Sequence, residues 1–364
     1  MIGIPEAFSP SYATARQKYL KAADAAGIAV DSNFHPQKGR DGEELAMDVA
    51  YDGAPDAEHL LIVTSACHGV EGHCGSGVQV FALHDDEWRD KARAAGVAVM
   101  YVHALNPHGF SHRRRVTHEN VDLNRNFVDF SQPLPVNAAY AKLHALLLPD
   151  TWPPTAENQA AVTAWIAEHG TSAYQAAVTG GQYQFPDGLF FGGQAPTWSN
   201  QTFRKVLEKH GQSARKLAWI DLHTGLGPNG LGERIFACRD DKAAYARANA
   251  WWGTPASPVT SIYDGSSTSA FLTGLMWGAM YDECPKAEYT AIALEYGTVP
   301  ILEVTGALRA DHWLHKHPEA PAELADAIHA QMLEAFYTDS DGWKGQIVSQ
   351  ARQAMFQAVD GLTG

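Results

Sequence analysis

The chain has 364 residues, of which 45% are hydrophobic and 19% charged, as in ordinary globular proteins. The net charge of −14 and the absence of a basic stripe interleaved with aromatics argue against nucleic acid as a partner. The four cysteines lack C-x-x-C spacing, and no leader-like segment or long apolar run occurs, so we expect reduced thiols, no membrane span and a cytoplasmic location.

The pattern of apolar residues in the first half of the chain predicts alternating strands and helices. Apolar periodicity indicates a helix over 10–27, strands over 45–52 and 59–66, a helix over 76–95 and a strand over 97–107. Strand, helix and strand in this order predict a βαβ unit in a mainly parallel sheet. The polar segment 106–130 has no period, and a loop of this length in a compact domain is usually functional.

The second half continues the alternation. We expect helices over 138–148 and 156–177, an ordered Gly- and aromatic-rich segment at 180–194, strands over 216–222, 233–239 and 289–297, and helices over 240–252, 268–281, 300–317, 321–337 and 343–359. No repeat or linker divides the chain. The sequence therefore predicts one α/β domain over 1–364, with a mixed, mainly parallel sheet flanked by helices.

Chemically active side chains follow the predicted strands. The segment ACHGVEGHCGSG (66–77) holds His68 and Glu71 three positions apart, and two histidines with one glutamate form a hydrolytic zinc site. His223 follows the strand 216–222, and Asp221 should face the same side and accept its second ring proton. Glu295 lies near the end of the last strand. Open α/β sheets place their sites at these carboxyl ends.

The four segments HGVE, VDLNRNF, DLHTG and ALEYGT, in this order, resemble the zinc metallocarboxypeptidases of the carboxypeptidase A superfamily, and more closely its bacterial branch of domain-of-unknown-function members. The resemblance covers about residues 45–305. It implies a carboxypeptidase-like fold and one Zn²⁺ per chain, bound by His68, Glu71 and His223. It also implies that Glu295 is the general base.

The resemblance assigns substrate contacts as well. Asn124 and Arg125 match the pair that holds a terminal carboxylate, and Arg115 matches the arginine that polarises the scissile carbonyl, with Arg113 and Arg114 as alternatives. Tyr263 matches a mobile tyrosine that closes over substrate. Ala270 then occupies the position that sets side-chain specificity, which favours a neutral pocket.

Three functions agree with this pattern. The first is a zinc hydrolase that removes a C-terminal residue from small or modified peptides. The second is an N-acyl amino-acid amidohydrolase like aspartoacylase or succinylglutamate desuccinylase. The third is a catalytically silent binding protein on the same fold, against which the complete set of ligands and base argues. The pattern leaves the substrate and the oligomeric state open.

Overall fold

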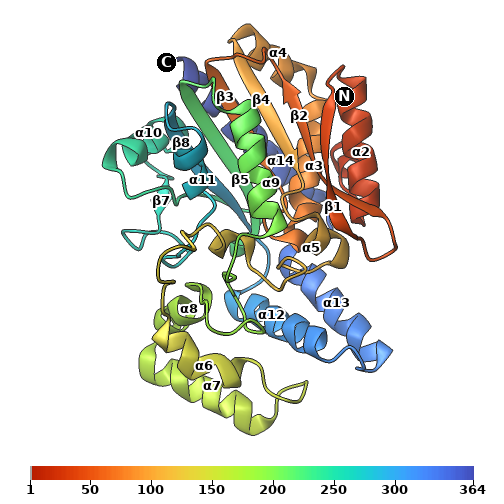
Figure 1. The fold of residues 1–364 in the computed structure, drawn as a ribbon, viewed down its shortest axis with the longest axis vertical. Coiled ribbons are helices and arrows are strands. Elements are labelled where there is room, and N and C mark those ends of the chain that lie inside the picture. The colour runs from red at the N-terminus through yellow and green to blue at the C-terminus, as the bar shows by residue number, and fades with distance from the viewer. Residues whose placement is uncertain (1) are drawn as a thin grey trace.

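A computed structural model describes residues 2–364, which form an eight-stranded sheet in the order β1-β2-β4-β3-β5-β8-β6-β7 (Figure 1). The four central strands, β4, β3, β5 and β8, run parallel. At one side β1 and β2 pair antiparallel with their neighbours, and at the other β6 pairs antiparallel with β8 and parallel with β7. This confirms the predicted mixed α/β fold. The strands span Val30–Lys38 (β1), Glu44–Asp52 (β2), His59–Thr64 (β3), Val97–His103 (β4), Lys216–Asn229 (β5), Gly232–Phe236 (β6), Thr260–Ser261 (β7) and Glu288–Gly297 (β8).

Helices cover both faces of the sheet and extend past its carboxyl edge (Figure 1). One face packs against α2, α3, α4, α10 and α14, and the other against α9 and α11. The helices span Ile4–Ala7 (α1), Tyr12–Ala25 (α2), Gly69–Glu71 (η1), Gly72–Leu83 (α3), Asp86–Ala94 (α4), Pro107–His112 (α5), Leu123–Arg125 (η2), Ala138–Leu147 (α6), Ala156–His169 (α7), Thr171–Thr179 (α8), Trp198–His210 (α9), Lys242–Trp252 (α10), Gly278–Glu283 (α11), Ile301–Lys316 (α12), Ala322–Phe336 (α13) and Asp341–Thr363 (α14).

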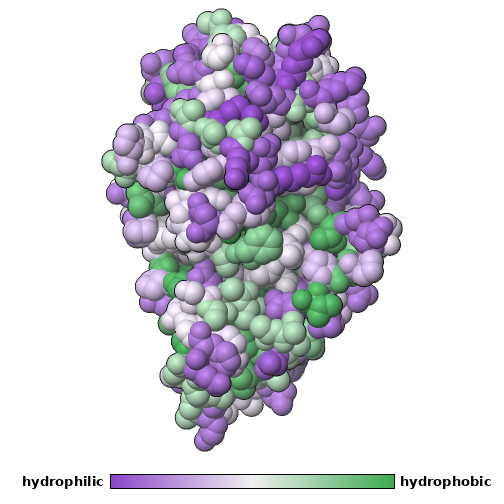
Figure 2. Space-filling view, turned by 90° about the vertical axis from the view of Figure 1, so that its left-hand side faces the viewer, coloured by the Kyte–Doolittle hydropathy of each residue, from purple (hydrophilic) through white to green (hydrophobic). Residues whose placement is uncertain are grey.

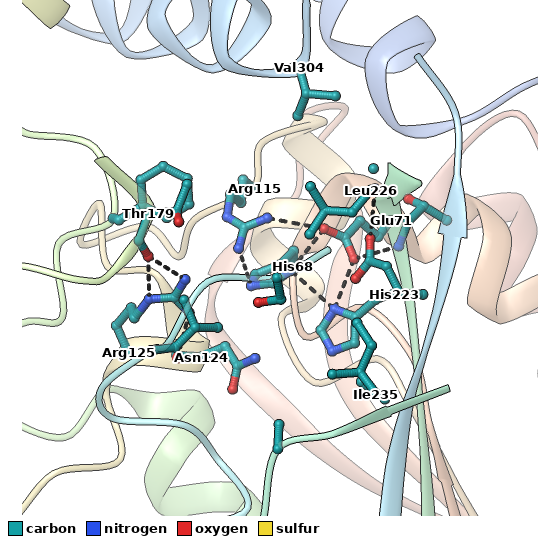
Figure 3. Close-up of a pocket in the computed structure, with 18 of the residues that line it drawn as sticks. His68, Glu71, Arg115, Asn124, Arg125, Thr179, His223, Leu226, Ile235 and Val304 are labelled. Atoms are coloured by element: carbon teal, nitrogen blue, oxygen red, sulfur yellow. Dashed lines mark hydrogen bonds and ion pairs between the residues drawn. The ribbon is translucent and has the colours of Figure 1, made fainter. Parts of the chain in front are cut away.

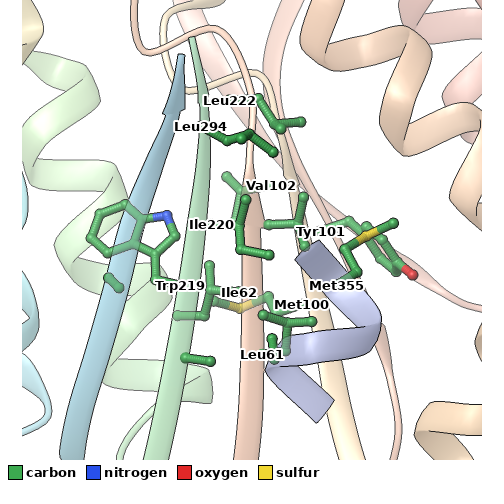
Figure 4. Packing of buried hydrophobic residues seen from close by; sticks show 14 of the residues in the cluster. Leu61, Ile62, Met100, Tyr101, Val102, Trp219, Ile220, Leu222, Leu294 and Met355 are labelled. Atoms are coloured by element: carbon green, nitrogen blue, oxygen red, sulfur yellow. The ribbon is translucent and has the colours of Figure 1, made fainter. Parts of the chain in front are cut away.

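The core lies on both faces of the central strands (Figure 4). Trp219 and Ile220 are neighbours on β5 and point to opposite faces, where Trp219 packs against Phe203 of α9 and Ile220 faces the side of Met355 on α14. Each fully buried aliphatic side chain contributes about 1.5–3 kcal/mol relative to exposure. Burial on both faces explains why these strands read as continuous apolar runs.

A second apolar cluster lies beyond the carboxyl edge of the sheet. It joins α6, α7 and α8 to α12 and α13 and includes Leu143, Val178, Leu308 and Phe336. In Figure 1 these helices form the lower part of the molecule, below the strand ends. The loops that follow the central strands therefore lie between the sheet and this helical layer.

Several predicted elements differ from the structure. The helix α9 was not predicted. The edge strand β1 was not predicted either, because it is polar, mostly part-exposed and contains Pro36. The helix expected over 268–281 is wrong: only Gly278–Glu283 is helical, since serine and aspartate side chains bond to the backbone at 261–269 and Gly274 has φ +70°. Gly170, with φ +90°, divides the helix expected over 156–177.

The surface is that of an ordinary globular fold. On the face shown in Figure 2, hydrophilic residues cover the upper part, and apolar residues gather around and below the middle. Within residues 2–364, no helix has the length and hydrophobicity needed to cross a membrane.

The assignment of residues 1–364 to one catalytic domain stays a prediction.

Candidate metal centre and active site

The side chains of His68 and Glu71, which follow β3, converge with that of His223, which lies within β5 because this strand continues past the predicted 216–222 to Asn229 (Figure 3). The Nδ1 atom of His68 lies 2.8 Å from Oε1 of Glu71, and the Nδ1 atom of His223 lies 3.0 Å from Oε2. The two Nδ1 atoms are 3.3 Å apart. All three residues are at most 4% exposed. The structure thus brings together the three residues that the sequence predicts as metal ligands.

Glycines allow the turn that carries His68 and Glu71 to pack tightly. A Cβ atom on Gly69 would lie 2.0 Å from the carbonyl carbon of Gly109, and one on Gly72 would lie 2.5 Å from the ring of Phe110. The amides of Gly69 and Val70 donate to the carbonyls of Arg115 and Arg114, at 3.0 and 2.9 Å. The backbone therefore connects this turn directly to the arginine-rich loop.

Carboxylates contact the outer nitrogens of both histidines. Nε2 of His223 is hydrogen-bonded to Asp221, as the spacing predicts, and Nε2 of His68 lies 3.2 Å from Oδ1 of Asp122. Burial opposes a charge on His223, but the Asp221 carboxylate raises the pKa of its imidazole well above the ordinary value. Burial also opposes ionisation of Glu71, yet His68 and His223 lower the pKa of its carboxyl.

This donor set fits a transition metal such as zinc. With a proton on each Nε2 atom, facing Asp122 or Asp221, each Nδ1 would direct a lone pair toward the carboxylate of Glu71. Three electron donors this close repel one another unless a proton or a metal cation lies between them. Two imidazoles and a carboxylate that line a cavity are the ligands of a catalytic zinc site with an open position.

Cys67, Asp221 and His223 form another group of donor atoms within 4.8 Å of one another. Burial raises the pKa of the Cys67 thiol well above its ordinary value, which disfavours the thiolate that a metal needs. Cys67 is fully buried, and it does not line the cavity. The group of His68, Glu71 and His223 therefore fits a catalytic metal better.

Glu295 lies on β8 opposite His223 in the sheet register, and its carboxylate also lines the cavity. Its Oε1 accepts a hydrogen bond of 3.0 Å from the amide of Leu226. Burial and the nearby charge of Glu71 raise the pKa of Glu295 to about 8. A carboxyl group with a raised pKa in a cavity suits proton transfer.

Of the three consecutive arginines, only Arg115 lines the cavity. Its Nε donates to Oδ2 of Asp122 at 2.9 Å and its Nη1 to Oε1 of Glu71 at 3.2 Å. Arg114 turns away and pairs with Asp311, and Arg113 donates to the carbonyl of Pro10. The geometry favours Arg115 over the two alternatives that the sequence left open.

Asp122 is a site residue that sequence reasoning missed. It is fully buried and contacts both His68 and Arg115, and its Oδ1 accepts a hydrogen bond from the amide of Asn124. Burial raises the pKa of its carboxyl, but Arg115, Arg125 and His68 together hold that pKa well below the ordinary value. Its place in the VDLNRNF segment was the signal that could have identified it.

Arg125 and Asn124 lie to one side of the histidines, in η2 (Figure 3). Arg125 is 2% exposed, and its guanidinium donates to the carbonyls of Thr179 and Asn124. These contacts use three of its five N–H groups. Within residues 2–364, no carboxylate forms an ion pair with it. Oδ1 of Asn124 accepts from the amide of Met276, so its side-chain amide stays available to a ligand.

Tyr263 and Ala270 do not line the cavity. The ring of Tyr263 is 37% exposed, and its hydroxyl donates to the carbonyl of Cys238. Their roles in closure and specificity stay predictions. The cavity lining does include apolar side chains, among them Ala237, Ile262, Leu272, Leu275, Trp277 and Ala293.

The family model described as "Protein of unknown function (DUF2817)" matches residues 8–350, a wider span than the predicted 45–305. No curated protein matches the chain. The structure of bovine thrombin-activatable fibrinolysis inhibitor in complex with tick carboxypeptidase inhibitor superposes with a TM-score of 0.53 and 10% identity, covering 98% of this chain and 97% of that one. At this identity the match shows a shared fold alone.

Two further structures match less closely. Carboxypeptidase A from Helicoverpa armigera gives a TM-score of 0.47 at 12% identity, covering 90% of this chain and 74% of that one. A metallo-carboxypeptidase from Pseudomonas aeruginosa, in complex with (2-guanidinoethylmercapto)succinic acid, gives 0.45 at 15%, covering 95% and 69%. Neither score is high enough to support an argument.

Proposed function

The chain belongs to the DUF2817 family, and we propose that it is a zinc-dependent hydrolase that removes a C-terminal residue from small or modified peptides. The observation that carries this proposal is Arg125, a buried guanidinium without a carboxylate partner beside the proposed metal ligands. A buried cation is costly unless an anion neutralises it. A substrate with a free terminal carboxylate supplies that anion and presents its last peptide bond to the ligand cluster.

The proposed roles follow from the positions of the side chains. Zinc bound by His68, Glu71 and His223 would supply Lewis-acid polarisation and an acidified water. Glu295 takes a proton from the attacking water and returns it to the leaving amine; a bound cation would lower its pKa from about 8 and so leave the carboxylate that a base requires. Arg125 and Asn124 hold the terminal carboxylate, and Arg115 donates to the carbonyl oxygen as negative charge develops there.

The role proposed for Arg115 requires one particular tautomer of His68. Nη2 of Arg115 lies 2.7 Å from Nε2 of His68, a contact that requires an unprotonated nitrogen. Ligation through Nδ1 requires the proton on Nε2, facing Asp122. Nη2 of Arg115 can then no longer donate to that nitrogen, and it is free to donate to a substrate carbonyl.

An N-acyl amino-acid amidohydrolase is the second candidate, because such substrates also end in a carboxylate. The cavity wall beside Thr224 favours it: Val304, Leu308 and Phe336 provide an apolar surface there, and Oγ1 of Thr224 donates to the carbonyl of Phe336. This surface suits an apolar acyl group as well as the side chain of a penultimate residue.

The test is hydrolysis by zinc-loaded protein of a panel of dipeptides and of N-acyl amino acids matched in their C-terminal residue. We expect one zinc per chain and turnover of substrates with a free carboxylate. Faster cleavage of the peptides supports the carboxypeptidase, and faster cleavage of the acyl compounds supports the amidohydrolase. Bound zinc with no turnover of either set would indicate the binding protein.

A further inference from the structure

One aromatic ring lies close to both arginines of the site. The ring centroid of Phe190 is 5.0 Å from Cζ of Arg115 and 5.6 Å from Cζ of Arg125. Phe190 belongs to the Gly- and aromatic-rich segment 180–194, which connects α8 to the loop before α9. It lines the cavity and is 6% exposed. The segment thus brings a single buried ring against two guanidinium groups.

The backbone at Phe190 is strained. Its φ of +52° lies in the left-handed region, which a bulky residue rarely adopts. Hydrogen bonds fix this conformation: the carbonyl of Phe190 accepts from the amide of Gln182 at 3.1 Å, and the carbonyl of Phe191 accepts from the amide of Asp122 at 2.8 Å. Strain of this kind persists where surrounding contacts enforce it, and it concentrates at functional sites.

Two positively charged side chains lie near the same ring in this buried site. Arg115 and Arg125 carry like charges. Only Arg115 forms ion pairs with carboxylates, those of Asp122 and Glu71, while Asp122 attracts Arg125 from beyond contact distance. The face of an aromatic ring is negative and attracts a guanidinium within about 6 Å of its centroid. One ring near both groups therefore offsets their repulsion without an additional carboxylate, which would compete with the substrate for Arg125.

We propose that Phe190 is a positioning residue that holds the guanidinium groups of Arg115 and Arg125 at a fixed separation, and so sets cleavage at the bond next to the terminal carboxylate. This inference rests on the proposed function. If Arg115 donates to the scissile carbonyl and Arg125 binds the terminal carboxylate, the distance between the two groups must match one residue of substrate. An aliphatic side chain would fill the space but would attract neither cation, which would leave their repulsion opposed only by the contacts that each arginine makes on its own.

The test compares Phe190→Leu with Phe191→Leu in the zinc-loaded protein. Phe191 is a matched control, since it is the next residue and is 5% exposed, but its ring lies over neither arginine. We expect Phe190→Leu to lower kcat/KM for free-acid substrates by about tenfold to a hundredfold, the scale of a small misplacement, and to narrow their advantage over amidated substrates. Phe191→Leu should lower the thermal stability by a similar amount. It should keep kcat/KM for free-acid substrates, and the ratio of that value to the one for amidated substrates, within about twofold of the wild type.

A second readout separates this inference from the proposed function. If the wild type hydrolyses nothing, the proposed function fails, but the ring can still be tested through the Nε–Hε NMR resonances of Arg115 and Arg125. Loss of the ring current should shift both resonances in Phe190→Leu and neither in Phe191→Leu. Equal activity losses in the two variants, or unshifted arginine resonances in Phe190→Leu, would show that Phe190 only fills space.

Discussion

Arg115 and Asp122 form a buried ion pair in which Nε of the arginine donates to Oδ2 of the carboxylate at 2.9 Å. The other oxygen of Asp122 lies 3.2 Å from Nε2 of His68. One carboxylate therefore orients both a proposed metal ligand and the proposed carbonyl-polarising arginine. Such outer contacts determine the affinity and the reactivity of a metal site nearly as much as the ligands themselves.

Asp122→Asn keeps the shape of this contact and removes its charge. We expect zinc affinity to fall by about tenfold to a hundredfold, because His68 loses the carboxylate that fixes its tautomer. Competition titration against a chelating dye measures this. Asp311→Asn is the matched control, since Asp311 pairs with Arg114 at the same distance, 2.9 Å, outside the cavity. Equal affinities of the two variants would show that Asp122 acts only on the fold.

Zinc binding should release protons and strengthen as pH rises. In the metal-free protein the pKa of His223 is raised by Asp221, and that of Glu295 is raised to about 8, so both groups hold protons at pH values near 7. Ligation requires neutral His223, and a nearby cation lowers the pKa of Glu295. Calorimetric titrations in buffers of different ionisation enthalpy count the protons. Affinity independent of pH between about 6 and 8 would contradict the assigned ligand.

Most of the residues that lie together at the candidate site could be predicted from the sequence. His68 and Glu71 follow the apolar run of β3, while His223 and Glu295 lie at the ends of the apolar runs in β5 and β8, and the carboxyl ends of parallel strands meet at one edge. The periodicity of those strands also predicted the fold.

The remaining contacts depend on chain geometry that no local pattern encodes. Phe190 reaches Arg115 and Arg125 only because the excursion through α6, α7 and α8 packs back onto the carboxyl edge. From sequence, Asp122 could cap a turn or contribute to the site. In the structure it caps η2 and also contacts His68. The segment after Tyr263 carries helical periodicity, but its side chains bond to the backbone instead.

Glu295→Gln keeps the size of the side chain and removes the base. Zinc content should stay at one per chain, while turnover falls by at least about a hundredfold, the usual scale of general-base catalysis. Metal analysis and steady-state kinetics on one preparation test both. Glu233→Gln serves as control, because Glu233 faces Glu295 in the sheet register but does not line the cavity. Loss of zinc from Glu295→Gln would indicate that Glu295 is a metal ligand and not the general base.

The proposed function depends above all on the binding of the substrate's terminal carboxylate by Arg125. Amidation of that carboxylate removes two charge-assisted hydrogen bonds and leaves the buried guanidinium without its anion. Arg125→Ala removes the group that distinguishes the two substrates. Arg309→Ala is the matched control, because Arg309 also donates to helix carbonyls, those of Leu146 and Leu147, and lies outside the cavity.

The most direct test is therefore the ratio of kcat/KM for a substrate with a free terminal carboxylate to that for its amide. We expect a ratio of about a hundred or more in the wild type and in Arg309→Ala, falling toward one in Arg125→Ala. Equal cleavage of acid and amide by the wild type would contradict the account and leave Asn124 and Arg125 as structural supports of the loop.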